Sequence, residues 1–509
     1  MKLLHSPAEV QDNFDQLKNH EKSTLEKFVH DNFSLENQME EFDPIDWKPQ
    51  PKLISRIQDL NYARFAQDLN GRWKMLCRKI KAEVEAQPDR YSLLYLPHPV
   101  IVPGGRFREV YYWDSFWIIR GLLQCEMYDT VKGMLLNFVH LIRQFGKIPN
   151  GGRKYYLNRS QPPLFIPMVR EYERSTGDSD FVKSILPEMV AEFSYWQNEH
   201  LVTFEKDGRM YSMVRYNCQD DGPRPESYFE DYNTVRKSSN QNHEVQNEMY
   251  WELKTGAETG WDYSTRWYIP TNGDLQDTKP RSIIPVDLNC FHAQNAQILS
   301  EYFTLFQNDS EAQKYQEIYR GHNESISQVL WHAQDGIWYD YDFQNSVSRP
   351  YFSPSNLTPL WTGNGSKAQE KSAVDYLSRQ NLEDFPGGVP TTFQESGQQW
   401  DFPNCWPPLE HILVQGLEKT GLPEARQMAF TIASQRVQGC YVNFQQKGHM
   451  FEKYDATQIN RIGSGGEYEV QLGFGWTNGV VLDFLDMYSD QLSTELGFPV
   501  RKLSGSRGN

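Results

Sequence analysis

Residues 103–117, PGGRFREVYYWDSFW, are the stretch from which the fold and the site can be predicted. A proline and two adjacent glycines favour a turn in which the backbone can approach a ligand closely. Charged and aromatic residues follow, and an apolar run over residues 116–123 then continues at helical spacing, with Asp114 and Ser115 as candidate N-caps. The stretch predicts a polar and aromatic patch at the beginning of a helix, although alone it equally suits a loop with buried rings and solvated charges.

The length and charge of the chain limit its architecture and its partners. With 509 residues, it exceeds the roughly 250 to 300 residues of a single ordinary core, so we expect either two domains or one large closed architecture. A net charge of −16 without a Lys/Arg block argues against nucleic acid or an anionic membrane as a partner. The aromatic content of 14% suits a concave site for sugar faces as well as a large core.

The cysteines and the first residues indicate little about the compartment. The six cysteines are scattered without a CxxC pair, so neither a zinc ribbon nor a dense disulfide framework is indicated. No apolar run approaches the roughly 18 residues of a membrane span, and residues 1–10 lack the apolar core of a signal peptide. Acceptor sequons are compatible with a secretory origin, which we favour, although such short motifs often arise by chance. They occur at Asn32, Asn158, Asn308, Asn323, Asn356 and Asn364.

Apolar residues recur at i, i+3 and i+4 through most of the chain, which is typical of amphipathic helices. Strand-like alternation is scarce. Residues 11–51 are charged and poor in large apolar groups, and they indicate an arm or a peripheral helix. The expected helices cover residues 56–86, 116–127, 130–145, 164–175, 180–199, 245–255, 287–306, 310–331, 368–378, 406–420, 424–437 and 476–489.

About a dozen helices joined by long loops can each bury one face by closing into a ring of helical hairpins. We therefore predict an all-α fold, an (α/α)₆ toroid or six-hairpin barrel, with long active-site loops gathered at one end. The expected division is an N-terminal arm with peripheral helices over residues 1–55, the toroid over residues 56–495 and a C-terminal tail over residues 496–509.

Carboxylates are the expected source of the chemistry. The sequence has no HExxH zinc motif, no P-loop, no GxSxG and no calcium loop, and its 12 histidines are dispersed, so no cofactor and no metal are indicated. Paired carboxylates among aromatic residues suit glycosidic cleavage, in which one protonates the leaving oxygen and the other activates a water molecule.

Two carboxylates are candidates for these roles. Asp262 is the candidate acid, because the neighbouring rings of Trp261 and Tyr263 can desolvate it and so favour its protonated form. Glu452, just before a glycine-rich loop, is the candidate base. A helix N-cap remains an alternative interpretation for Asp262, as does an ion pair with Lys453 for Glu452.

Several of these stretches resemble the trehalases (glycoside hydrolase family 37), which cleave α,α-trehalose on an (α/α)₆ barrel. Residues 103–117 and 399–408 (QWDFPNCWPP) are similar to the two signatures of that family. The further matches are IPNGGRKYYLNRSQPP (148–163), RPESYFED (224–231), ETGWDYSTRW (258–267), EKYD (452–455) and GGEYEVQLGFGWTNG (465–479). The resemblance therefore covers most of the chain after its first ninety residues, which match poorly.

The resemblance implies an inverting hydrolysis of the disaccharide trehalose to two glucose molecules, with Asp262 as general acid and Glu452 as general base. It also implies sugar contacts from arginines, carboxylates and tryptophans. The implied contacts are Arg106, Trp113, Asp114, Asn150, Arg159, Gln161, Arg224, Glu226, Gly260, Trp406 and Glu467. Each arginine also suits a structural ion pair with one of these acids, and both roles can hold at once.

Two departures and two alternatives qualify the resemblance. Ser464 interrupts the glycine run before Glu467, which raises the question of how that loop closes, and Cys405 stands where the second signature usually has Gly, Ala or Val. The alternative functions are another (α/α)₆ carbohydrate-active enzyme, namely an oligosaccharide glucosidase or a disaccharide phosphorylase, and a catalytically inactive sugar sensor. Intact candidate carboxylates disfavour the sensor.

Overall fold

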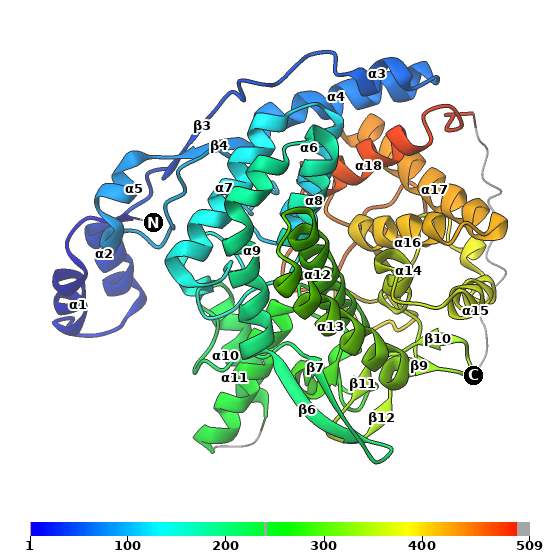
Figure 1. Cartoon of the computed structure of the whole chain (residues 1–509). Coiled ribbons are helices and arrows are strands. Elements are labelled where there is room, and N and C mark those ends of the chain that lie inside the picture. The colour runs from blue at the N-terminus through cyan, green and yellow to red at the C-terminus, as the bar shows by residue number, and fades with distance from the viewer. Residues whose placement is uncertain (1, 239–241, 496–509) are drawn as a thin grey trace.

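A computed structural model describes residues 2–238 and 242–495 of the chain. Six helices form a closed ring in which each contacts the next and the last contacts the first. These inner helices are α6 (Asp114–Gln124), α8 (Phe165–Thr176), α12 (Val286–Leu305), α14 (Thr358–Thr362), α16 (Pro407–Thr420) and α18 (Gly475–Met487). The outer helices, seen around them in Figure 1, are α4 (Leu60–Leu76), α7 (Tyr128–Phe145), α9 (Ser179–Glu199), α13 (Asp309–Ser325), α15 (Lys367–Ser378) and α17 (Pro423–Lys447). The predicted all-α (α/α)₆ toroid is confirmed.

The two layers differ in burial as their sequences dictate. The inner helix α18 is buried over almost its whole length because neighbours surround it, which is the expected place for a helix that is apolar on all sides. The outer helix α7 instead buries one stripe, including Val131, Leu135 and Phe138, and exposes Arg143 in its last turn. Buried side chains of both layers form one continuous apolar core.

Smaller elements lie outside the ring. The N-terminal helices are α1 (Pro7–Asp15), α2 (Lys22–Asn32) and α3 (Lys52–Arg56), and Figure 1 shows α1 and α2 beside each other at the edge of the molecule. Helices α10 (Tyr228–Lys237) and α11 (His243–Glu258) lie at another edge. Within the described residues, no helix has the length and apolar character needed to cross a bilayer. The predicted tail over residues 496–509 lies outside the described part of the chain.

Most strands are only two residues long and tie loops together. The two-residue strands are β1 (Lys2–Leu3), β2 (Phe33–Ser34), β5 (Val100–Ile101), β8 (Ile283–Ile284), β9 (Trp331–His332), β10 (Ile337–Trp338), β11 (Tyr341–Asp342), β12 (Val347–Ser348), β13 (Asn404–Cys405) and β14 (Tyr454–Asp455). The pair β13–β14 is antiparallel and joins the loop before α16 to the loop after α17. This pairing fixes those two loops relative to each other.

The prediction of one continuous helix over residues 56–86 is wrong. Helix α4 ends at Leu76, and β4 (Cys77–Ile80) then pairs antiparallel with β3 (Met39–Glu41) and β5 (Val100–Ile101), followed by α5 (Ala82–Ala86). Hydrogen bonds to strands distant in sequence override the local helical spacing, which cannot reveal them.

The prediction of Asp114 and Ser115 as N-caps is also wrong. The backbone already turns earlier, since Ser115 N donates to Tyr112 O at 3.2 Å and Trp113 has helical dihedral angles. Asp114 is therefore the first residue of α6, and the Ser115 hydroxyl donates to Tyr111 O at 2.7 Å.

One longer hairpin was not predicted. Strands β6 (Leu201–Lys206) and β7 (Arg209–Val214) pair antiparallel around Asp207 and Gly208, whose φ values are 51° and 76°. An Asp-Gly pair with both residues at positive φ matches the tight turn that joins two strands. The signal was present in the sequence, but most residues of the hairpin are at least partly exposed, so apolar alternation does not mark it.

Candidate active site

A cavity of about 530 Å³ opens where the loops that precede the inner helices converge. Trp113 directly precedes α6, Trp406 precedes α16 and Trp476 lies in the first turn of α18, so the closed ring brings these distant segments to one end. Every residue predicted from the sequence as catalytic or substrate-binding lines this cavity. Its size is within the range of small-molecule sites. The individual roles of these residues remain predictions.

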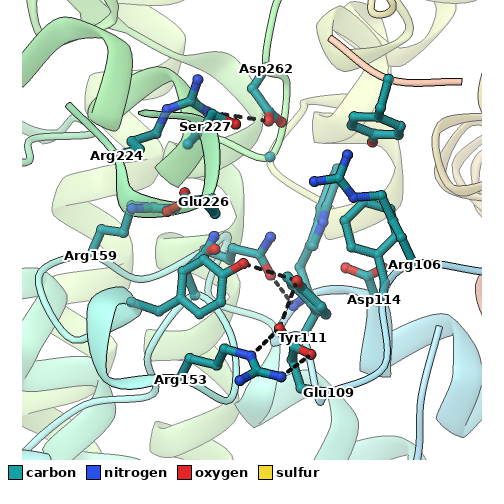
Figure 2. A pocket seen from close by; sticks show the side chains of 18 of the residues that line it. Arg106, Glu109, Tyr111, Asp114, Arg153, Arg159, Arg224, Glu226, Ser227 and Asp262 are labelled. Atoms are coloured by element: carbon teal, nitrogen blue, oxygen red, sulfur yellow. Dashed lines mark hydrogen bonds and ion pairs between the residues drawn. The ribbon is translucent and has the colours of Figure 1, made fainter. Parts of the chain in front are cut away.

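Asp262 lies in the loop after α11, at the wall of the cavity shown in Figure 2. Its Oδ2 is 3.9 Å from Nη1 of Arg224. Burial raises the pKa of Asp262 to about 7, against the lowering effect of the Arg224 charge. The alternative interpretation as a helix cap does not hold, because the short 3₁₀ turn Thr265–Trp267 that follows is capped by Ser264. Asp262 is thus a carboxyl group that can carry a proton near neutral pH.

Glu452 is buried and is oriented by the glycine-rich loop that follows it. The Tyr468 hydroxyl donates to Glu452 Oε1 at 2.8 Å, and Gln471 N donates to Oε2 at 3.2 Å. Burial raises the pKa of Glu452, while the charge of Lys453 and these hydrogen bonds lower it. The suggested ion pair with Lys453 is not formed, because Lys453 Nζ instead donates to Gln399 Oε1 and to Gly465 O.

A third carboxyl group, Asp114, faces the same cavity. Burial, assisted by the charges of Glu452 and Asp262, raises the pKa of Asp114 to about 8. Asp114 is therefore largely protonated at neutral pH, so it can donate as well as accept a hydrogen bond.

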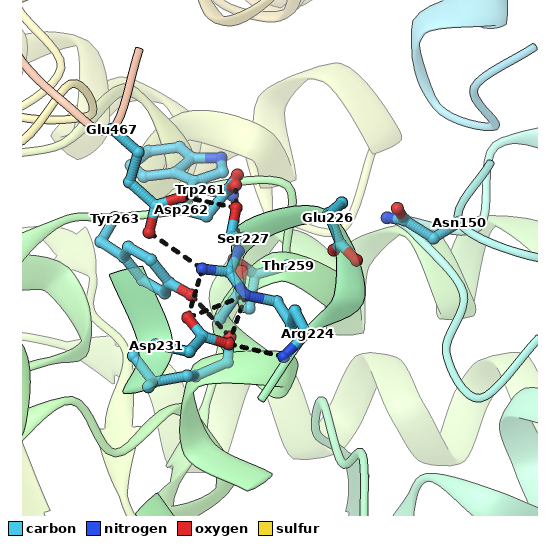
Figure 3. Close-up of polar contacts among 12 residues, drawn as sticks. Asn150, Arg224, Glu226, Ser227, Asp231, Thr259, Trp261, Asp262, Tyr263 and Glu467 are labelled. Atoms are coloured by element: carbon cyan, nitrogen blue, oxygen red, sulfur yellow. Dashed lines mark hydrogen bonds and ion pairs between the residues drawn. The ribbon is translucent and has the colours of Figure 1, made fainter. Parts of the chain in front are cut away.

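Arg224 is the centre of the polar network in Figure 3. Its guanidinium donates to Asp231 through Nε at 3.0 Å and Nη2 at 2.7 Å, and to Glu467 Oε1 at 2.9 Å. Ser227 donates to the other oxygen of Glu467 at 3.0 Å. These bonds connect the segment before α10 to the glycine-rich loop, and the Nη1 group faces Asp262. The expected structural ion pair is therefore present, in a position that also suits substrate contact.

The buried Arg159 and the partly buried Glu226 form a second ion pair at the cavity wall. Within the described residues, Arg159 Nε and Nη1 and Glu226 Oε2 have no hydrogen-bond partner. Asn150 and Gln161 hold the neighbouring loops, since Asn150 N donates to Arg159 O at 3.0 Å and Gln161 Oε1 accepts from Trp113 N at 3.1 Å. Because buried polar groups are normally paired, the unpaired atoms indicate that a ligand or water completes this wall.

Several lining residues were not identified from the sequence. Arg153 binds Glu109 with Nε 2.9 Å from Oε1, and Tyr111 lies on the same side of the cavity (Figure 2). The hydroxyls of Tyr111 and Tyr156 are 3.0 Å apart. Tyr468, which holds Glu452, was also missed. All five lie within the stretches that carried the family resemblance. Sequence spacing does not show which residues of such a stretch line the cavity and which hold their neighbours in place.

Aromatic rings also line the cavity. The rings of Trp400 and Trp406 are stacked at 3.7 Å, and Trp113 lies 5.8 Å from Trp400. Gly260 has a φ of 76°, and a Cβ there would lie 2.8 Å from the Trp113 ring. Only glycine therefore fits, and it lets the backbone and the ring meet at the cavity wall.

The two departures from the family pattern are accommodated without strain. Ser464 is not among the residues at positive φ, whereas Gly465 and Gly466 have φ values of 77° and 86°. Cys405 is buried in β13, where its thiol lies 3.4 Å from Gly387 O. Among the described residues, no three His, Cys, Asp or Glu side chains gather closely enough to hold a metal ion.

Comparisons with known proteins agree with one another. The family model described as Trehalase matches residues 1–489. The chain is 46% identical over 508 residues to the trehalase of Apis mellifera, and the match covers 97% of this chain and 81% of that protein. It is 41% identical over 503 residues to the trehalase of Homo sapiens, with 97% and 86% covered. The neutral trehalase of Saccharomyces cerevisiae has a similar fold, with a TM-score of 0.63 at 22% identity and 80% of each chain covered.

Proposed function

Because this chain belongs to the trehalase family, we propose that it hydrolyses α,α-trehalose to two glucose molecules by an inverting mechanism. Asp262 is the general acid and Glu452 the general base of the proposed reaction. The observation that carries this assignment is that two carboxyl groups in different environments line one cavity. Asp262 has a pKa raised to about 7, whereas Glu452 accepts two hydrogen bonds that favour its ionised form.

The proposed reaction needs both protonation states at once. Asp262 gives its proton to the glycosidic oxygen as the bond from that oxygen to the anomeric carbon breaks. Glu452 takes a proton from a water molecule whose oxygen attacks the same carbon from the opposite face. Asp262 ends ionised and Glu452 ends protonated, and proton exchange with solvent restores both. One glucose leaves as the β anomer and the other keeps its α configuration.

The remaining predicted residues are assigned to sugar recognition in this proposal. Arg159 and Arg224 offer guanidinium donors to hydroxyl groups, and Glu226 and Glu467 accept from them. Two arginines held by carboxylates at fixed positions suit a ligand with many hydroxyls and no charge. The other proposed contacts are Arg106, Trp113, Asp114, Asn150, Gln161, Gly260 and Trp406, all of which line the cavity.

A substrate panel tests this function against the alternatives. The protein is incubated with trehalose, maltose, sucrose and a longer glucan, with and without phosphate, and both glucose and glucose 1-phosphate are assayed. We expect glucose from trehalose alone at a rate that is independent of phosphate, and almost none from the Asp262→Asn variant. Phosphate-dependent sugar phosphate would support a phosphorylase, and preferred release from the longer glucan would support a glucosidase.

A further inference from the structure

Two buried side chains connect the loops that carry the candidate acid and base. Lys453 directly follows Glu452, and its Nζ donates to Gln399 Oε1 at 2.8 Å and to Gly465 O at 3.2 Å. Gln399 Nε2 in turn donates to the backbone oxygen of Asp262 at 2.7 Å. Because a lysine can only donate, it must face the amide oxygen of Gln399, which leaves the amide NH₂ for Asp262. Two hydrogen bonds thus join segments about 190 residues apart.

A column of stacked groups makes the same connection beside the cavity. The Arg266 guanidinium lies 4.5 Å from the Trp261 ring, which stacks on Trp400 at 5.2 Å and 17°. Trp400 stacks on Trp406 at 3.7 Å and 2°, and the Lys453 ammonium lies 5.2 Å from the Trp406 ring. A cation therefore closes the column at each end. At one end of the column, Trp261 directly precedes the candidate acid Asp262, and at the other end, Lys453 directly follows the candidate base Glu452.

The charge of Lys453 is held at a fixed place beside the base. Burial lowers the pKa of Lys453 to about 8, while the nearby Glu452 and Asp262 raise it, so the ammonium is charged at neutral and lower pH. Among the other groups facing Glu452, Arg106 also lowers its pKa and the Tyr468 hydroxyl stabilises its anion. Asp114, which faces Glu452 across the same cavity, is largely protonated at neutral pH.

We propose that Lys453 and Gln399 are positioning residues that fix the separation and orientation of Asp262 and Glu452. The proposal rests on the acid and base assignment of the preceding subsection. Lys453 makes no direct hydrogen bond to either carboxylate. Gln399 donates to the backbone oxygen of Asp262 and, at 3.4 Å, to the Tyr468 hydroxyl that holds Glu452. Both act through the loops they hold, and Lys453 also acts through its charge. A displacement of about 1 Å at a reacting group can lower turnover a hundredfold, so such a link has a measurable effect.

The test compares variants that separate the hydrogen-bond link from the charge. Lys453→Met removes both, Lys453→Arg keeps the charge, and Gln399→Leu removes the link but leaves the ammonium. The matched control is Lys254→Met, since Lys254 is equally buried but binds Asp220 and Asp221. For each variant, kcat and KM for trehalose are measured per folded molecule across pH, together with the melting temperature.

For Lys453→Met we expect kcat about 10- to 100-fold lower with KM changed only a few-fold. The acidic limb of the pH–rate profile of this variant should move to higher pH, because loss of the cation raises the pKa of Glu452. Gln399→Leu should lower kcat but move that limb less than Lys453→Met does, because the ammonium remains and only a long hydrogen bond to Tyr468 is lost. Lys453→Arg should restore the limb. The Lys254→Met control should lose stability but keep the parent kcat and pH profile.

The proposal is overturned if Lys453→Met and Gln399→Leu keep the parent kcat and pH profile, or if Lys254→Met reproduces their kinetic changes. If Lys453→Met does not fold, Gln399→Leu and Lys453→Arg still decide the matter. Glu452→Gln separates this failure from failure of the proposed function. An inactive Glu452→Gln beside a normal Lys453→Met rejects only the positioning role, whereas a fully active Glu452→Gln rejects the base assignment and the positioning role with it.

Discussion

Replacement of Arg224 by alanine should lower the free energy of unfolding of the protein as well as its activity. Arg224 is 1% exposed and holds Asp231 through two guanidinium nitrogens and Glu467 through one. Removing one partner of a buried ion pair leaves an uncompensated charge and typically costs about 3 to 5 kcal/mol. Glu467 is partly exposed and can be hydrated, so we expect the lower value, about 3 kcal/mol.

This free energy corresponds to a small change in melting temperature. At roughly 2.1 cal/mol/K per residue, the entropy of unfolding of a chain of this length is about 1 kcal/mol/K, so Arg224→Ala should lower the melting temperature by about 3 °C. Denaturant titration gives the free energy of unfolding directly. The loss of the cation near Asp262 should raise the pKa of that acid above about 7. Any residual activity should therefore persist to higher pH than in the parent protein.

A double-mutant cycle isolates the buried ion pair. In an Asp231→Asn background no carboxylate is left unpaired at this position, so Arg224→Ala should cost clearly less there than in the parent. Arg224→Lys keeps the charge but not the fork, and it should recover only part of the stability. The reasoning is refuted if Arg224→Ala costs less than about 1 kcal/mol, or if its cost is the same in both backgrounds.

Three further predictions concern the acid, the base and the cavity wall. Asp262→Asn and Glu452→Gln should each lower kcat by about two to four orders of magnitude with little change in a thermal melt, and near-normal turnover in either would remove that residue from the mechanism. The pH–rate profile should fall above about pH 7, where Asp262 loses the proton it donates, and at low pH, where Glu452 gains one; undiminished turnover at about pH 9 would exclude Asp262 as the acid. Gly260→Ala should destabilise by about 2 to 4 kcal/mol, because a methyl group would overlap the Trp113 ring and the residue has positive φ. Denaturant titration should show a much smaller loss in Gly448→Ala, which has a similar φ but open space around it, and equal losses would refute the overlap.

Much of the fold follows from local pattern. The expected helix over residues 130–145 corresponds to α7 (Tyr128–Phe145) and the one over residues 406–420 to α16 (Pro407–Thr420), because each has an uninterrupted apolar stripe or run and ends at a glycine in the left-handed conformation. Residues 77–80 form strand β4 instead of the predicted helix. Their strand depends on partners that are distant in sequence, and local periodicity does not contain that information.

The sequence predicted which residues line the candidate site, but not which of their side chains contact one another. The motifs identified the residues that line the cavity, and their assigned roles stay predictions until tested. What the sequence could not give is which side chains bind each other, such as Arg224 with Asp231 or Lys453 with Gln399. Such pairs depend on side-chain directions set by the closed ring, and they decide the charge and proton affinity of the reacting groups.

The anomeric configuration of the products tests the paired roles of Asp262 and Glu452 most directly. An inverting pair of carboxyl groups stands roughly 6.5 to 9.5 Å apart to admit a water molecule, whereas a retaining pair stands at about 5 to 5.5 Å and forms a covalent intermediate. Proton NMR of a fresh trehalose digest, recorded before mutarotation, should show α- and β-glucose in equal amounts. Two α anomers per trehalose would mean retention and would contradict the assignment of Glu452 as a base.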